Sequence, residues 1–314
     1  MSALRVVLHP KRPPGVEAFL RSVPGLVLDC PADDDGVARA LRDGAQVLAG
    51  YMWREDFLVP SLRWIAGAGA GVEQYPLARL AEHGIVLTNA AGVHAECVAE
   101  HAFALLLALT RRIGESVRHM GRSTWVQLPG EELGGKKLAI VGLGRIGEGI
   151  ARRAQGWGMS IVGVKRHPAD YRGILDDVRG AERIAEVCEW ADIVMLCAPA
   201  TPDRKPLIGP AELERLGAGW IVNVGRGSLI DEPALIQALG SGGLRGAGLD
   251  VTAVEPLPVD SPLWALPNVV ISAHNAGDSP GFGPRWGEIF AHNLQALAGR
   301  GDWRNRVGDA GAAR

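Results

Sequence analysis

The chain has 314 residues, of which 47% are apolar and 22% charged, and its formal net charge is −2. This length suffices for two domains with real cores, and scattered Lys and Arg without a basic stripe exclude the electrostatic footprint of a nucleic-acid-binding protein. Four cysteines without a C-x-x-C pair and eight dispersed histidines exclude a zinc finger or a disulfide framework, so no metal site is expected.

Short apolar runs rich in β-branched residues recur through the first hundred residues, separated by helix-like polar segments. They span residues 4–8, 26–28, 46–48, 64–65 and 85–87. Since each parallel strand needs a crossover, usually a helix, this alternation predicts a doubly wound parallel sheet.

A helix rich in Ala and Leu is expected over residues 98–118, and its composition is typical of a buried connection between domains. Its apolar run is far shorter than the roughly 20 residues that span a bilayer, so no membrane partner is expected. The chain also begins without an evident targeting segment, which favours a cytoplasmic location.

A second series of strand-like runs follows the Gly- and Pro-containing stretch 127–135. It predicts six further strands. The whole pattern therefore predicts the α/β class, with two Rossmann-like doubly wound parallel-sheet domains. The second series comprises residues 138–141, 161–164, 193–196, 221–224, 247–251 and 269–271.

The first strand of the second series, Lys137–Val141, leads directly into a glycine-rich turn with the pattern G-x-G-x-x-G. A helical pattern follows, and a glycine-rich turn between a strand and a helix predicts a dinucleotide site. Gly142 permits the tight turn, Gly144 lets a pyrophosphate approach the backbone, and Gly147 lets helix and strand pack closely.

The end of the next strand carries Lys165, Arg166 and His167, where an NAD site usually presents an acidic residue to the ribose 2′-hydroxyl. A carboxylate would repel a 2′-phosphate, whereas these two cations would pair with it. The sequence therefore predicts NADP(H) as the cofactor, with NAD less favoured. The alternative is that both cations are solvated residues at a strand end.

Several further motifs, in order from about Trp64 to Asn305, resemble those of the D-isomer-specific 2-hydroxyacid dehydrogenase family. The resemblance implies a flavodoxin-like substrate domain of residues 1–97 plus 281–314, an NADP-binding Rossmann domain of residues 98–280, and a catalytic cleft between them. The motifs are Gly67-Ala-Gly-Ala-Gly71, the loop from Asn89 to Glu100, Cys197-Ala-Pro199-Ala-Thr201-Pro202, Asn223-Val-Gly225-Arg226-Gly227, Gly248-Leu-Asp250-Val251, Glu255-Pro256, and Val269 to Gly277.

The resemblance also implies residue roles. Arg226 would hold the substrate carboxylate and carbonyl, and His274, paired with Glu255, would exchange the proton. The backbone N–H groups of Ala70 and Gly71 would bind the carboxylate, and Trp53 is expected to contact substrate, with Trp286 left open as the residue that lines the pocket instead. The residues expected around the cofactor are Val98, Gly142, Gly144, Arg145, Ile146, Gly147, Lys165, Arg166, Cys197, Ala198, Pro199, Thr201, Val224, Gly225, Asp250, His274, Ala276 and Gly277.

The resemblance therefore implies an NAD(P)-dependent D-2-hydroxyacid dehydrogenase that transfers a hydride between NADP(H) and a small 2-keto or 2-hydroxy acid. Glyoxylate and hydroxypyruvate are the first expected substrates. Glu255 argues against formate oxidation, because formate dehydrogenases of the superfamily carry Gln there. A homodimer is expected through the apolar helix, for example over residues 102–109.

Three alternatives stay open. A phosphoglycerate dehydrogenase-like enzyme is less expected, because no appended regulatory domain follows the motifs. The other two are a nucleotide-sensing interaction protein of the same fold and a scaffold whose activity has lapsed. A missing Arg226 or His274 would have favoured either, and both residues are present. The departures from the family pattern are Lys165 for Asp, Glu73 for Asp, and Asn275 after the catalytic His.

Overall fold

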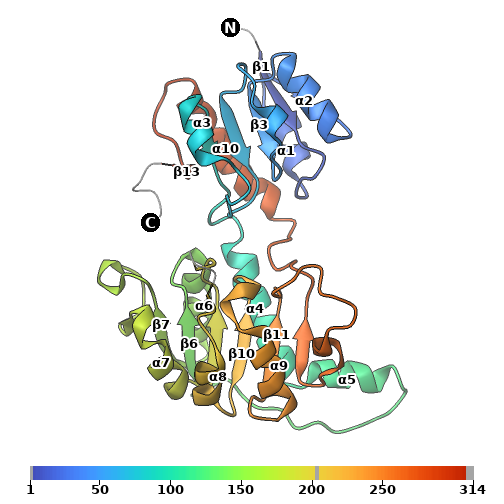
Figure 1. Cartoon of the computed structure of the whole chain (residues 1–314), viewed down its shortest axis with the longest axis vertical. Coiled ribbons are helices and arrows are strands. Elements are labelled where there is room, and N and C mark those ends of the chain that lie inside the picture. The colour runs from blue at the N-terminus through green and yellow to red at the C-terminus, as the bar shows by residue number, and fades with distance from the viewer. Residues whose placement is uncertain (1–2, 202–204, 309–314) are drawn as a thin grey trace. The chain divides into compact units, whose positions relative to one another are not determined.

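A computed structural model describes residues 3–201 and 205–308 of the chain. The chain divides into two compact units (Figure 1), of which unit 1 comprises residues 1–94 and 278–314 and unit 2 comprises residues 95–277. Both units are α/β, with a central sheet built mainly from parallel strands. The class predicted from the alternating apolar runs is confirmed.

Unit 1 contains a six-stranded sheet in the order β13-β5-β4-β3-β1-β2, with only β13 antiparallel. Helices α1 and α10 pack on one face and α2 and α3 on the other, since each pair contributes to a different apolar cluster. The strands are β1(Leu4–Leu8), β2(Leu26–Asp29), β3(Val47–Gly50), β4(Trp64–Gly67), β5(Val86–Thr88) and β13(Arg306–Val307), and the helices are α1(Val16–Ser22), α2(Asp34–Arg42), α3(Leu77–Glu82) and α10(Phe282–Leu297), with a 3₁₀ turn η1(Glu55–Phe57).

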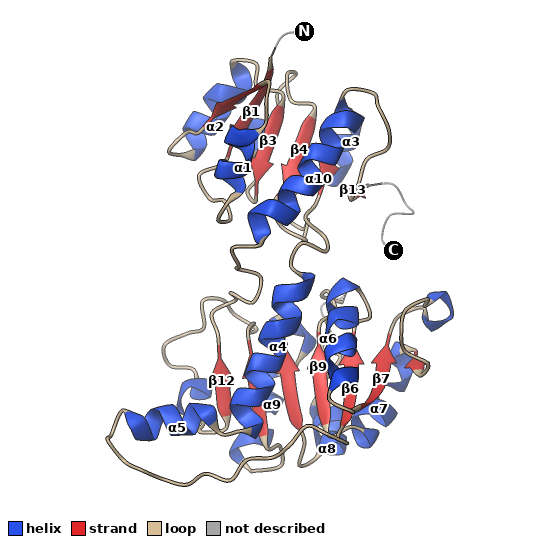
Figure 2. Ribbon diagram, turned by 180° about the vertical axis from the view of Figure 1, so that it is seen from behind, coloured by secondary structure: helices blue, strands red, loops and turns tan. Residues whose placement is uncertain are grey.

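Unit 2 contains a seven-stranded parallel sheet in the order β12-β11-β10-β9-β6-β7-β8. Helices α4 and α6 cover one face (Figure 2), and α7, α8 and α9 cover the other. The strands are β6(Lys137–Val141), β7(Ser160–Val164), β8(Val178–Arg179), β9(Ile193–Leu196), β10(Trp220–Asn223), β11(Gly246–Leu249) and β12(Val269–Ile271), and the helices are α4(Ala95–Thr110), α5(Ile113–Met120), α6(Arg145–Gly156), α7(Ile184–Trp190), α8(Pro210–Leu216) and α9(Glu232–Gly240), with 3₁₀ turns η2(Pro168–Asp170), η3(Ala181–Arg183), η4(Gly227–Leu229) and η5(Pro262–Ala265).

The prediction of a single helix over residues 98–118 is wrong, because this segment forms two helices. The helix ends at Thr110, Arg112 adopts a left-handed conformation with φ of 55°, and α5 begins at Ile113. The apolar stretch of α4 is buried against α6 and the sheet, whereas α5 has no buried residue. The break therefore separates a core helix from a surface helix.

Strands β8 and β13 were not predicted, because each has two residues and neither forms an apolar run. Within residues 3–201 and 205–308, no helix combines the length and apolarity that a membrane crossing needs.

Candidate functional site

The glycine-rich turn after β6 has the geometry that its motif predicts. Gly142 has φ of 108°, and a Cβ there would lie 2.6 Å from the Ala198 backbone nitrogen. A Cβ at Gly147 would overlap the Gly142 carbonyl oxygen, so both positions need glycine for packing. Beside Gly144, in contrast, the described part of the chain places no contacting atom within 4 Å of a Cβ position and no side chain that caps α6. An open helix N-terminus of this kind fits a pyrophosphate.

The cationic residues predicted to select the cofactor lie at the end of β7. The Lys165 ammonium donates to the Leu143 carbonyl oxygen at 3.3 Å, so its charge lies beside the glycine-rich turn. Arg166 and His167 are exposed. The strand end thus presents positive charge and no carboxylate at the position where a ribose 2′-substituent is recognised in this type of fold.

Most other expected cofactor residues follow the carboxyl ends of neighbouring parallel strands, which share one edge of the sheet. Cys197 donates its thiol to the Gly142 carbonyl at 2.9 Å, and burial raises the pKa of that thiol to about 12. Val98 is buried on α4. Ala198, Pro199 and Thr201 follow β9, Val224 and Gly225 follow β10, Asp250 follows β11, and His274, Ala276 and Gly277 follow β12, while Arg145 and Ile146 open α6. Pro202 lies outside the described residues.

Arg226 follows β10 on a loop that is fixed by the side chain of Asn223. The Asn223 amide accepts from the Gly225 N–H at 3.0 Å and donates to the Arg226 carbonyl at 2.9 Å. A Cβ at Gly227 would overlap the Thr252 carbonyl, so this loop lies directly against the segment after β11. The Arg226 guanidinium donates to the Gly225 carbonyl at 2.8 Å and is half-buried. Its remaining N–H groups can form a fork with a carboxylate.

His274 and Glu255 pair as expected. The His274 Nδ1 lies 2.7 Å from Glu255 Oε2, and the other carboxylate oxygen accepts from the Thr252 N–H at 3.1 Å. The His274 ring is half-exposed, which leaves Nε2 available for a ligand. Since Thr252 also meets Gly227, the structure brings Arg226, Glu255 and His274 onto adjoining segments of one sheet edge.

The main chain of His274 is itself held in an uncommon conformation. Its φ is 51°, in the left-handed region, and its N–H donates to the Asp250 carbonyl at 2.8 Å. A non-glycine residue keeps such a conformation where surrounding bonds determine it. The loop after β12 is therefore shaped to aim this side chain.

Asp250, which was expected to contact the nicotinamide, has a nearly buried carboxylate with several partners within the protein. It accepts from the Ser272 hydroxyl at 2.6 Å and from the Asn275 and Ala276 N–H groups at 3.1 Å each. The His101 Nε2 lies 2.7 Å from the Ser272 hydroxyl oxygen, so His101 belongs to the same hydrogen-bond network. Asp250 thus holds the loop that carries His274. The sequence motifs included Asp250 and Ser272 without a role for the serine, whereas His101 had no local pattern that marked it.

In unit 1 the Gly-rich segment follows β4. Within residues 3–201 and 205–308, the Ala70 and Gly71 N–H groups donate no hydrogen bond, so both are available for a carboxylate. The Asn89 side chain donates to the Ala70 carbonyl at 2.9 Å, and the Ala90 N–H donates to the Gly69 carbonyl at 2.8 Å. These bonds brace the loop from its carbonyl side.

The two tryptophans considered for the substrate pocket both pack into unit 1. The Trp53 ring contacts Phe57 and Tyr75 edge-on or tilted, and its buried indole nitrogen has no hydrogen-bond partner among the residues that the structure describes. Trp286 is buried on α10 and donates to the Gly67 carbonyl at 3.2 Å. This packing favours structural roles for both, with Trp286 bracing the start of the Gly-rich loop.

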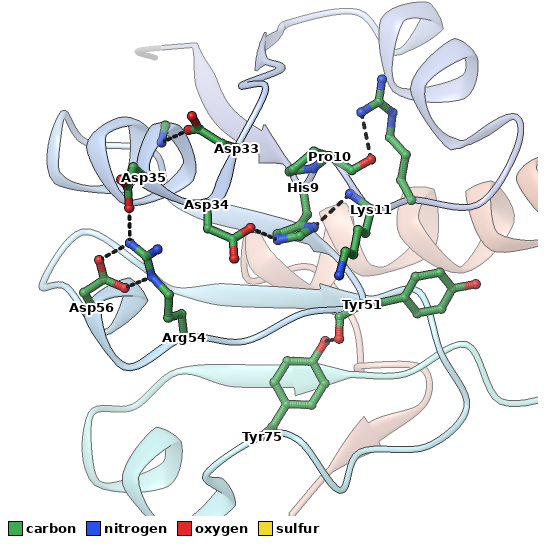
Figure 3. Close-up of polar contacts among 12 residues, drawn as sticks. His9, Pro10, Lys11, Asp33, Asp34, Asp35, Tyr51, Arg54, Asp56 and Tyr75 are labelled. Carbon is green, nitrogen blue, oxygen red and sulfur yellow. Dashed lines mark hydrogen bonds and ion pairs between the residues drawn. The ribbon is translucent and has the colours of Figure 1, made fainter. Parts of the chain in front are cut away.

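A polar cluster that sequence reasoning did not identify lies at the strand ends of unit 1 (Figure 3). Fully buried His9 accepts the Lys11 N–H at Nδ1, 3.0 Å away, and its Nε2 lies 3.0 Å from Asp34 Oδ1. Arg54 pairs nearby with Asp35 and Asp56. Since both ring nitrogens of His9 are engaged, the cluster ties the loop after β1 to the start of α2.

Comparison with known proteins extends these observations. Residues 103–276 match the family model described as D-isomer specific 2-hydroxyacid dehydrogenase, NAD binding domain. A glyoxylate reductase of Korarchaeum cryptofilum (strain OPF8) is 37% identical over 247 residues, covering 76% of this chain and 74% of the relative. A glyoxylate/hydroxypyruvate reductase of Arabidopsis thaliana is 33% identical over 311 residues, covering 93% of each chain.

A D-3-phosphoglycerate dehydrogenase of Methanocaldococcus jannaschii is 34% identical over 282 residues, which are 87% of this chain but 52% of the relative. Among solved structures, an NADPH-dependent glyoxylate/hydroxypyruvate reductase from Sinorhizobium meliloti, in complex with NADP and malonate, superposes with a TM-score of 0.78 at 30% identity, covering 98% of this chain and 97% of that one.

Proposed function

Because the chain belongs to the D-isomer-specific 2-hydroxyacid dehydrogenase family, we propose that it reduces glyoxylate, hydroxypyruvate or a related 2-keto acid to the D-2-hydroxy acid with NADPH. Family and relatives make it an NAD-binding oxidoreductase of the D-2-hydroxyacid dehydrogenase type. The observation that carries the proposal is the His274–Glu255 pair at 2.7 Å, on the same sheet edge as Arg226.

The acid-base chemistry falls to His274. Its Nδ1 is engaged by Glu255, so Nε2 is the nitrogen that would give a proton to the carbonyl oxygen during reduction and take it back during oxidation. Glu255 fixes the orientation of the ring through this contact. Arg226 would polarise the carbonyl and hold the carboxylate with its free N–H groups.

The carboxylate would also be bound by the main-chain N–H groups of Ala70 and Gly71, which make no other hydrogen bond within the described residues. Contacts at both the carboxylate and the carbonyl define the orientation of a 2-keto acid. A simple aldehyde or ketone offers no carboxylate and would lose these contacts.

The proposed preference for NADPH depends on Lys165 and Arg166. The nicotinamide cofactor supplies the hydride when bound. Gly142, Gly144, Gly147 and the start of α6 would hold its pyrophosphate, and the cations at the end of β7 would pair with a 2′-phosphate. The relative from Sinorhizobium meliloti is NADPH-dependent, which is consistent with this assignment.

The test measures absorbance at 340 nm with glyoxylate, hydroxypyruvate, pyruvate and phenylpyruvate, each with NADPH and with NADH. We expect faster oxidation of NADPH, loss of turnover by about 10²- to 10⁴-fold in His274→Ala, and a shift toward NADH in Lys165→Asp. The controls are His83→Ala on the surface of unit 1 and Lys137→Asp at the start of β6.

Two outcomes would contradict the proposal. If the protein binds NADPH but turns over no 2-keto acid, a nucleotide-sensing role replaces the catalytic one. If Lys165→Asp and Lys137→Asp behave alike, the 2′-phosphate assignment is wrong while the catalytic assignment stands.

A phosphoglycerate dehydrogenase-like activity is the second candidate, favoured by the Methanocaldococcus jannaschii relative that matches 87% of this chain. Oxidation of D-3-phosphoglycerate with NAD or NADP, measured beside the 2-keto acids, separates the two. A kcat/KM for D-3-phosphoglycerate above that for glyoxylate reduction would select the second candidate.

We also propose that the protein is a homodimer, but through a different surface from the one first expected. Ala102, Phe103, Leu105 and Leu106 of α4 are buried within unit 2 itself. Helix α5 instead exposes Ile113, Val117 and Met120 at helical spacing, each more than half exposed, and Trp125 beyond it is 96% exposed. A cavity of about 690 Å³ adjoins this helix.

A second copy is the occupant we propose, because a two-fold axis would pair this one apolar surface with itself. Size-exclusion chromatography with light scattering should show twice the mass of 33.2 kDa. The double substitution Val117→Glu and Met120→Glu should yield a monomer, whereas Val259→Glu, at another exposed apolar position, should not. A monomeric wild-type protein at micromolar concentration overturns the proposal.

A further inference from the structure

The loop between β7 and β8 carries the cations at the end of β7 and then returns to the sheet. Short turns shape its middle, where the Asp170 N–H donates to the His167 carbonyl at 3.2 Å and the Tyr171 N–H donates to the Pro168 carbonyl at 3.0 Å. The placement of the cations depends on the contacts that hold the two ends of this loop, residues 165–175.

The start of the loop is fixed by Lys165. Its N–H donates to the Arg179 carbonyl at 3.0 Å, and its ammonium donates to the Leu143 carbonyl at 3.3 Å. Arg166 and His167, the next two residues, are exposed. Their placement therefore depends on the rest of the loop.

The far end of the loop is fixed by Tyr171. Its ring packs on the apolar cluster beneath α6, in which Leu175 is buried, and its hydroxyl oxygen accepts the Leu175 N–H at 3.2 Å. Since that oxygen accepts from the main chain, its own hydrogen is free to be donated. The pKa of Tyr171 is raised by burial and also by the neighbouring Glu148 carboxylate.

Glu148 lies in the first turns of α6, immediately after the glycine-rich turn, and its N–H donates to the Gly144 carbonyl at 2.9 Å. Its Oε1 is buried and, within the described residues, has no hydrogen-bond partner. A Cβ on Gly173 would overlap both this oxygen and the Tyr171 hydroxyl oxygen, so the two oxygens are close neighbours. The Tyr171 hydroxyl hydrogen is not used by the Leu175 contact, so this hydroxyl is the neighbouring group that can supply a donor to Glu148 Oε1.

We propose that Tyr171 and Glu148 form a latch that fixes the 165–175 loop to the first turns of α6 and so positions Lys165 and Arg166 for the 2′-phosphate of the cofactor. Both are positioning residues, because neither is placed to touch the phosphate itself. The inference rests on the proposed preference for NADPH, and it adds the contact that holds the two cations in position.

The sign of one substitution separates the latch from simple electrostatics. A carboxylate near a bound phosphate repels it, so removal of Glu148 should strengthen binding of any adenosine phosphate if charge alone mattered. If Glu148 holds the latch, the same removal weakens binding of a ligand that has a 2′-phosphate. Glu148→Gln, which loses the charge but keeps an acceptor oxygen, should retain the latch.

The experiment is isothermal titration calorimetry with 2′,5′-ADP and with 5′-AMP, which differ only in the 2′-phosphate and require neither nicotinamide nor turnover. We expect Tyr171→Phe and Glu148→Ala each to weaken 2′,5′-ADP binding by about three- to tenfold, the range for one hydrogen bond, and to change 5′-AMP binding by less than about twofold. The double variant Tyr171→Phe/Glu148→Ala should be no weaker than either single variant.

The outcomes distinguish the latch from the cofactor assignment. If wild type fails to prefer 2′,5′-ADP, the NADPH proposal and the latch are both overturned. If wild type prefers it and Lys165→Asp abolishes the preference, but Tyr171→Phe and Glu148→Ala retain it, only the latch is overturned. Equal weakening of both ligands, together with a lower melting temperature, would assign Tyr171 a general structural role and also overturn the latch.

Discussion

The two units present different kinds of polar groups at the positions assigned to the substrate. Unit 1 offers the main-chain N–H groups of Ala70 and Gly71, whereas unit 2 offers the side chains of Arg226, Glu255 and His274. In unit 1 any small residue provides the same N–H, so the conformation of the loop matters more than its side chains. In unit 2 the identity of each side chain matters.

The supporting bonds differ in the same way. Asn89 and Trp286 hold the unit 1 loop through its carbonyl oxygens. In unit 2, Asn223 and Asp250 bind main-chain N–H groups and so aim the side chains of their neighbours. We therefore expect substitutions in unit 2 to lower the turnover rate, whereas substitutions in unit 1 should mainly weaken substrate binding.

The largest expected effect is on Arg226. Arg226→Lys keeps the charge but loses the planar fork, so we expect kcat/KM for the 2-keto acid to fall by about 10²-fold or more. Steady-state kinetics beside Arg183→Lys, an exposed arginine that pairs with Glu186, provide the comparison. A loss below about tenfold would mean that side-chain identity matters no more in unit 2 than in unit 1.

A paired glycine experiment within unit 2 comes next. Gly147→Ala meets the Gly142 carbonyl, so we expect it to destabilise the unit by about 1–3 kcal/mol and to weaken cofactor binding by more than about tenfold. Gly144→Ala has open space and should leave the melting temperature of the ligand-free protein nearly unchanged while still weakening cofactor binding. Differential scanning calorimetry with cofactor titration measures both. Equal melting temperatures would contradict the packing argument.

A smaller effect is expected for the loop of unit 1. Asn89→Ala removes the bond to the Ala70 carbonyl, and we expect KM for the 2-keto acid to rise by about three- to tenfold with kcat nearly constant. Gln237→Ala, an exposed amide on α9, is the control. A fall in kcat comparable to that of Arg226→Lys would remove the distinction between the units.

The smallest effect is expected for Trp53. Trp53→Phe removes a buried indole N–H that has no partner among the described residues, so the ratio of kcat/KM for glyoxylate to that for phenylpyruvate should change by no more than about twofold. A larger change in this ratio would restore Trp53 to the substrate pocket.

The sequence predicted much of this molecule because its informative features are local. The strand before Gly142 and the helix after Gly147 identify the dinucleotide site, and continuous apolar runs mark strands buried on both faces. Strands β8 and β13 escaped prediction because they depend on pairing partners rather than on composition. The break at Arg112 also has no marker such as Gly or Pro.

The same distinction between local and long-range features applies to the residues of the candidate site. Arg226, Glu255 and His274 stand in recognisable motifs, and so do Asn223 and Asp250, which hold their loops. The long-range partners His101 and His9 stand in none. His101 reaches Ser272 across 171 positions of sequence, and His9 reaches Asp34 across 25. Such contacts arise from the packing of distant elements, which periodicity and spacing do not encode.

The way unit 2 interrupts unit 1 has a consequence for synthesis on the ribosome. Unit 2 is continuous from Ala95 to Gly277, so it can fold as soon as it has emerged. Unit 1 must wait for α10, whose Phe282, Trp286 and Phe290 complete one of its two apolar layers. A nascent chain halted near Gly277 would therefore carry a folded nucleotide-binding unit joined to a sheet with one incompletely covered apolar face. This exposed face would be accessible to proteases and chaperones.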